Sequence, residues 1–199
     1  MSKLRLVISA ALAIVFAAAI AVYSFYQPFI PDAVCSAIPA QASFVFQADS
    51  LEELLKSPVC SQLDKALGAG NTLKHLTGSN EWIRLAAASE IAVADILFRD
   101  AGRQKSWAAV TWVGWRSPWL RWKLENSGNE NLVMLGKHAV WPVWSYNAPD
   151  IARGMTITFS LTDNLFIVCL SEQPTDILLL LDTYDKRLPA APTNKGQQP

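Results

Sequence analysis

An uncharged apolar run from Leu6 to Tyr26 is the feature that most constrains how this chain can be arranged. At about 1.5 Å per residue, a helix of about 21 residues spans roughly 31 Å, which is the thickness of a bilayer's hydrocarbon core. The run is apolar on every face, whereas a helix packed on a soluble core usually keeps one polar side. The sequence therefore predicts a transmembrane anchor at residues 6–26, within a segment of cytoplasmic stub and anchor at residues 1–30.

The charges that flank this run predict its orientation. Lys3 and Arg5 precede it, and residues 27–55 contain no Lys or Arg. Positive charge is retained on the cytoplasmic side of membrane proteins, so the N-terminus is expected inside and the body outside. These signals are typical of a single-pass protein of a bacterial inner membrane whose body is periplasmic or otherwise extracytoplasmic.

Two other interpretations of the N-terminus involve export as well. A cleaved signal peptide would use the small-x-small site Ala19-Ile20-Ala21, but apolar residues continue to Phe29 and favour an uncleaved anchor. A lipoprotein would need different residues before Cys35. Export of the body is common to the signal-peptide and anchor interpretations, and whether the anchor is retained stays open.

The composition of the body excludes one class of partner. Its roughly 155 residues suffice for one domain with a core of its own. In the whole chain, 17 basic and 17 acidic residues balance and do not cluster, so nucleic acid is not an expected partner. The body is rich in tryptophan, concentrated between Trp107 and Trp144.

Local patterns divide the body into short strands and helices. Apolar alternation predicts strands at residues 42–48, 91–98, 106–115, 132–135, 139–146, 155–161 and 165–170. Helices are expected to begin near residues 51, 58, 73, 82, 119 and 174. This order predicts an α+β domain: a largely antiparallel sheet with helices packed on one face. The expected division is a linker at residues 31–41, the domain at residues 42–188 and a disordered tail at residues 189–199.

Several residues fix the expected ends of these elements. Ser50 and Glu53 have the spacing of a capping box, and Ser57-Pro58 and Ser117-Pro118 each place an N-cap before a proline. Pro142 lacks the N–H that a central strand would use, which predicts an edge strand or a bulge.

The chain resembles a family of bacterial membrane-anchored extracytoplasmic proteins of unknown function. The resemblance rests on the N-terminal anchor, on Ile38-Pro39-Ala40 leading into Ser43-Phe44-Val45-Phe46, and on the segment from Asp49 to Pro58. It implies an envelope location and a non-catalytic role. Members are usually longer, which implies that this chain is a first half or a truncated relative.

The sequence contains no recognisable catalytic or metal-binding motif. His75 and His138 have no ligand neighbour at metal-binding spacing, so neither a metal nor another cofactor is expected. The sequence contains no nucleophile elbow, phosphate-binding glycine loop or dinucleotide fingerprint. We expect a membrane-tethered, non-catalytic binding or scaffolding protein that acts on an envelope protein or a cell-wall component. The alternative is an envelope hydrolase or transferase whose carboxylate pair is assembled only by folding.

The tryptophan-rich segment is the only functional lead. Trp112, Trp115, Trp119 and Trp122 recur at helical spacing, but Pro118 would break a single helix, so we expect a strand followed by a helix. In that arrangement Trp107 and Trp115 share one face of the sheet, and Trp112 lies on the other.

These tryptophans fit either a core or an interface. We expect Trp112 and Trp115 to be structural and at least one of Trp119 and Trp122 to be partly exposed. The candidate binding residues are Trp119, Trp122, Arg116 and Arg121, because Trp and Arg often anchor interfaces. With Lys123, they also suit a surface at the level of lipid headgroups.

The three cysteines allow one structural prediction. Cys35 and Cys60 flank the first strand and helix in an oxidising compartment, which predicts a disulfide between them. The alternative, three unpaired cysteines, stays open. Cys169 lies in an apolar strand and is expected to be a buried thiol.

Overall fold

A computed structural model describes residues 14–16, 18, 34–61, 89–98, 104–147 and 154–191, with residues 97, 98, 104 and 105 described by backbone alone. The chain divides into two compact units, Met1–Ile30 and Pro31–Pro199. In the first unit, residues 14–16 and 18 are helical. The rest of the predicted anchor lies outside the described residues, as do His75 and the helices predicted near residues 73 and 82. Among the residues described, no helix is both long and apolar enough to span a bilayer.

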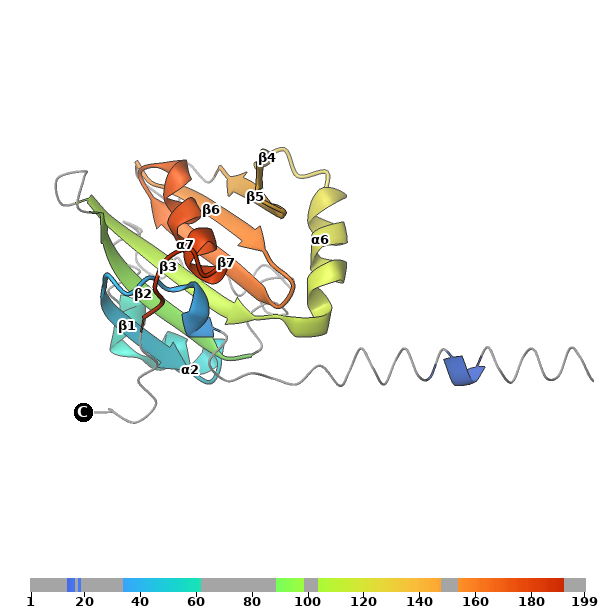
Figure 1. Cartoon of the computed structure of the whole chain (residues 1–199), viewed down its shortest axis with the longest axis horizontal. Coiled ribbons are helices and arrows are strands. Elements are labelled where there is room, and N and C mark those ends of the chain that lie inside the picture. Colours follow the sequence, from blue (N-terminus) through green and yellow to red (C-terminus); the bar gives the residue numbers. More distant parts are fainter. Residues whose placement is uncertain are drawn as a thin grey trace, which may run out of the picture. The chain divides into compact units, whose positions relative to one another are not determined.

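The second unit is built on a seven-stranded sheet in which every neighbouring pair is antiparallel (Figure 1). Its spatial order is β1-β2-β3-β7-β6-β5-β4. The strands are β1 (Ala42–Ala48), β2 (Ile91–Phe98), β3 (Gln104–Trp112), β4 (Leu132–His138), β5 (Trp141–Tyr146), β6 (Thr156–Leu161) and β7 (Leu165–Ser171). The prediction of an α+β domain with a largely antiparallel sheet is confirmed.

Two meanders make up this sheet. Strands β4 to β7 follow one another in space as in sequence, and β1 to β3 form the other group. The two groups join where β3 pairs with β7, from Trp107 opposite Leu170 to Trp112 opposite Leu165. Helix α6 (Ser117–Glu125) connects β3 near the centre to β4 at one edge. Consequently α6 has to cross a face of the sheet.

Strand β7 shows why both faces of the sheet are covered. Leu165, Ile167 and Cys169 alternate with Phe166 and Leu170, and all five are buried. A strand that is apolar on both sides is found where both faces of a sheet are packed. Helices lie on both faces, so the prediction of helices on one face is wrong.

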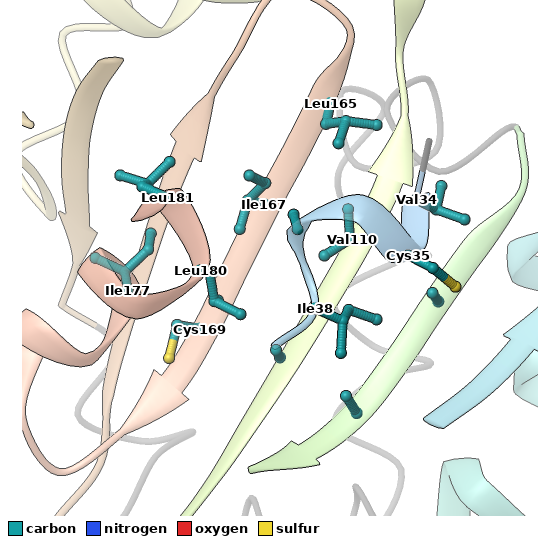
Figure 2. Packing of buried hydrophobic residues seen from close by; sticks show 14 of the residues in the cluster. Val34, Cys35, Ile38, Val110, Leu165, Ile167, Cys169, Ile177, Leu180 and Leu181 are labelled. Atoms are coloured by element: carbon teal, nitrogen blue, oxygen red, sulfur yellow. The ribbon is translucent and has the colours of Figure 1, made fainter. Parts of the chain in front are cut away.

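One face is covered by helix α7 (Ile177–Tyr184), which follows the 3₁₀ turn η4 (Pro174–Asp176), and by the short 3₁₀ helix η1 (Val34–Ala37). Figure 2 shows α7 presenting apolar side chains to β7, while Ile38 lies next to Val110 of β3. The fully buried side chains of this cluster include Ile38, Val110, Ile167, Leu180 and Leu181. Burial of each such side chain contributes about 1.5–3 kcal/mol.

The other face is covered by α2 (Leu51–Lys56), by the helical residues 58–61 and by α6. Leu54 and Val59 pack against Val93 and Trp107. Leu120 of α6 packs in a separate cluster on the same face. The 3.6-residue period of each helix places one apolar side on the sheet.

The capping predictions have different outcomes at two serines. Glu53 N donates to Ser50 Oγ at 3.2 Å, and Asp49 N donates to Glu53 Oε2 at 2.9 Å. A capping box therefore opens α2, with the Glu53 side chain accepting from the residue before the N-cap and not from the N-cap itself. Ser57 instead donates its hydroxyl to Leu54 O at 2.6 Å. Its side chain therefore closes α2 and is not the predicted cap of the next helix.

The packed body extends beyond residues 42–188 at both ends. Within the expected linker, η1 is buried against the sheet. At the other end, Pro39 bridges Ala190, and Ala191 N donates to Ile38 O at 2.7 Å. The first residues of the expected tail thus pair with the expected linker, because both carry apolar side chains that complete one cluster. Residues 192–199 lie outside the described part.

Pro142 does not mark an edge strand, because β5 lies between β4 and β6. Pro142 sits opposite Lys137, one residue before the first β5–β6 pair, Val143 opposite Ser160. The irregular register falls in the neighbouring strand, between Met134 and Gly136. The strand at this edge of the sheet is β4, and the bulge lies in β4 beside the proline.

Candidate interaction surface on α6

Gly114 positions the tryptophan-rich segment. Strand β3 ends at Trp112, and Gly114 has a φ of +51°, a left-handed conformation that glycine adopts without steric cost. The chain then turns through η3 (Gly114–Arg116) into α6. Trp115 consequently lies in η3, and the prediction that it shares a sheet face with Trp107 is wrong.

Four hydrogen bonds hold the start of α6 to the β6–β7 hairpin. Val113 N and Gly114 N both donate to Asn164 O, at 2.7 and 3.0 Å. The Ser117 hydroxyl donates to Thr162 O, and an Arg121 guanidinium nitrogen donates to Leu161 O at 3.1 Å. Ser117 is therefore a tertiary contact and not the predicted N-cap, a place that Arg116 occupies without a side-chain cap.

The inner side of α6 is apolar. Leu120 is buried and Leu124 half-buried, and both pack with Trp144 and Phe159. The Trp144 and Phe159 rings are stacked, with centroids 5.8 Å apart. The four-residue spacing of the two leucines fixes which side of α6 faces the sheet, and hence which side faces outward.

The outer side of α6 carries the exposed Trp119 and Trp122, and Trp115 is exposed in η3 just before it; these three tryptophans and Lys123 together form what we call the α6 aromatic surface. Trp115, Trp119 and Trp122 are 43%, 42% and 62% exposed. The Lys123 ammonium lies 4.9 Å from the centroid of the Trp119 ring. The expected exposure of Trp119 and Trp122 is confirmed, whereas Trp115 is more exposed than a structural residue should be.

The two arginines predicted as binding residues are held by the fold. Arg116 donates to Ser89 Oγ at 2.9 Å, and burial lowers the pKa of its guanidinium. Arg121 is half-buried, and its Nε has no hydrogen-bond partner within the described part of the chain. Both positive charges lie beside the aromatic surface, but their geometry is largely fixed by bonds to the body. The sequence indicated Lys123 only as a companion of the four candidate residues, whereas the structure places it directly over the Trp119 ring.

Among the described residues, two cavities adjoin this surface. One of about 290 Å³ lies between the end of α6 and the sheet, and its lining includes Trp122, Leu132, Tyr146 and Phe159. Another of about 210 Å³ lies between α6 and the β6–β7 turn, lined by Ser117, Pro118, Arg121, Trp122, Glu125 and Asp163. Both are at or below the lower end of the range for small-molecule sites. Trp122 lines both cavities, so this residue connects them to the α6 aromatic surface.

Strand β4 extends the exposed apolar area. Met134 is about half exposed, and Leu132 lines the larger cavity together with Trp122. Met134 pairs with Trp144, which belongs to the α6 side of the sheet. The apolar surface therefore continues from α6 toward the sheet edge.

A polar cluster lies on the opposite face, between β4–β5 and the end of α7. His138 Nε2 is 2.8 Å from Asp182 Oδ1, and Arg187 binds the same oxygen at 3.1 Å. Trp141 Nε1 donates to Asp185 at 3.0 Å. The hydrogen bond with His138 is the main cause of a lowered pKa for Asp182. This cluster joins two elements of the fold.

The cysteines are buried thiols, and the predicted disulfide between Cys35 and Cys60 is not present. Cys35 packs in the cluster under α7, whereas Val59, next to Cys60, packs on the other face of the sheet. Cys169 is fully buried, as expected, and burial raises the pKa of its thiol to about 12.

No protein-family profile, curated protein or solved structure matches the chain. In the parts of the chain that are described, no group of three or more His, Cys, Asp or Glu side chains could hold a metal ion.

Proposed function

We propose that this protein is a non-catalytic binding or scaffolding protein, tethered by residues 6–26 to a bacterial inner membrane with its body outside the cytoplasm. The tether is supported by the apolar length and flanking charges of the N-terminus. The predicted partner is an envelope component, and the α6 aromatic surface is the proposed site.

The observation that carries this proposal is the exposure of Trp119 and Trp122 on one helix. Tryptophan is a large side chain that folding normally buries, and it is enriched among residues that dominate binding. Leu120 and Leu124 already anchor α6, so the fold does not require apolar side chains on its outer side. A binding role explains why Trp119 and Trp122 are on the outer side of α6.

Site-specific photocrosslinking in living cells tests this role. A photoreactive phenylalanine analogue would replace Trp119 or Trp122 in the full chain. Phe44 is the matched control, because it is an aromatic residue of β1 that is 43% exposed, close to the 42% of Trp119. We expect adducts with an envelope component from positions 119 and 122, several-fold above position 44. Equal yields at all three positions would overturn the proposal.

The topology has its own test. A reporter that works only outside the cytoplasm, fused after Pro199, should be active, and the mature protein should retain residues 1–26. A mature N-terminus near Val22 would show that the apolar run is a cleaved signal peptide. In that case the body would be exported but not tethered.

A further inference from the structure

We propose that the partner of the α6 aromatic surface is the outer leaflet of the membrane that anchors the chain, recognised as an anionic lipid interface. This inference rests on the proposed function and specifies the ligand of its site. It makes α6 the element that orients the body on the bilayer.

The first argument is the length of chain between anchor and body. The predicted anchor ends at Tyr26, and the packed body begins with Val34 of η1. Eight peptide units fully extended span at most about 28 Å. With the proposed tether, the start of the body therefore stays within about 28 Å of the bilayer, which gives the lipid interface a high effective concentration.

The second argument is the chemistry of the exposed side chains. Tryptophan concentrates at the membrane–water interface because its ring is largely apolar and its indole N–H is polar. Trp115, Trp119 and Trp122 are all exposed within eight residues of sequence. Lys123 carries an apolar stem that can reach from the interface to headgroup phosphates.

The third argument is charge. The whole chain has a net charge of zero, but the stretch from Gly114 to Glu125 holds Arg116, Arg121 and Lys123 against a single acidic residue, Glu125. A local excess of positive charge beside exposed aromatic rings complements an anionic headgroup layer. The apolar side chain of Met134 enlarges the same side of the body.

A protein strand added at β4 is a weaker alternative for this region. The register of β4 shifts between Met134 and Gly136, and Lys137 follows the irregularity. Bulges and lysines are devices that prevent an edge strand from pairing with another chain. Binding of a lipid layer to the outer side of α6 does not depend on strand pairing, so the bulge and the lysine of β4 do not hinder it.

The test uses the full chain reconstituted through its anchor into vesicles of phosphatidylethanolamine and phosphatidylglycerol, with the photoreactive analogue at position 119, 122 or 44. We expect lipid adducts from positions 119 and 122, several-fold above position 44. Lys123→Glu should lower the adduct yield at position 122 by up to about tenfold in these vesicles, and little in vesicles of phosphatidylcholine. Lys56→Glu, a charge reversal at an exposed position of α2, should leave the yield unchanged.

The outcomes separate this inference from the proposed function. Lipid adducts at positions 119 and 122 no more abundant than at position 44 would overturn the lipid inference. If those positions still give protein adducts in cells, the binding role stands with a protein partner. If neither lipid nor cellular adducts exceed the control, both proposals fail.

Discussion

The indole ring of Trp112 occupies the space that a Cβ at position 114 would need. Any residue other than glycine at position 114 would therefore clash with this ring. The left-handed φ of Gly114 adds a second reason, because a side chain is strained in that conformation. The turn that leads into α6 therefore depends on glycine at position 114.

Gly114→Ala should destabilise the full chain by about 2–4 kcal/mol, combining backbone strain with displacement of a packed ring. Urea unfolding of the detergent-solubilised protein, followed by circular dichroism, measures the change. Gly128→Ala is the matched control, since Gly128 also has a positive φ, +59°, but has open space around it. It should cost only about 1 kcal/mol. Equal losses in the two variants would show that the Trp112 contact is unimportant.

The sequence predicted elements whose signals are local. The β6–β7 hairpin follows from alternating apolar residues around Thr162-Asp163-Asn164, and α6 follows from Pro118. The bond from Thr162 N to Leu165 O, 2.9 Å long, closes that hairpin within four residues. Such elements need no knowledge of distant contacts, which explains why their prediction was confirmed.

Features that depend on distant partners were missed. Ser117 was assigned as a cap because its neighbour is proline, but its hydroxyl binds a carbonyl 45 residues away. The disulfide prediction failed for the same reason: the face of the sheet to which each cysteine belongs is set by strand pairing and not by spacing. Gly114, in contrast, was a local signal that could have ended β3 before Trp115.

Exposed and buried tryptophans should differ sharply in their effect on stability. Trp119→Ala and Trp122→Ala should each lower the free energy of unfolding by less than about 1 kcal/mol, because both rings keep much of their surface in solvent. Trp144→Ala should cost about 3–5 kcal/mol, because Trp144 is 2% exposed and stacks on Phe159. Losses of several kcal/mol at positions 119 and 122 would assign these rings to the core and remove the support for a binding surface.

Cys169 should resist alkylation in the folded protein. Its thiol is fully buried with a pKa of about 12, so at pH 9 about one thiol in a thousand would be the reactive thiolate. Peptide mapping after iodoacetamide treatment at pH 9 should find Cys169 unmodified in the native protein and modified after unfolding without reductant. The same map should contain no peptide pair linked through Cys35 and Cys60. Rapid native modification of Cys169 would contradict the burial of β7.

The bond between His138 and Asp182 predicts a specific pH dependence of stability. Because the folded state lowers the pKa of Asp182 below the value of about 3.9 in an unfolded chain, the ionised carboxylate stabilises the fold. That contribution is fully present above about pH 4 and is lost as pH falls through the lowered pKa. Asp182→Asn should therefore cost about 1 kcal/mol at pH 7 and less near pH 2. Asp49→Asn, at an exposed position before α2, should change stability little at either pH. Urea unfolding across this range measures both variants, and an Asp182→Asn penalty that stays constant down to pH 2 would show that the charge of Asp182 does not stabilise the junction of β4 and α7.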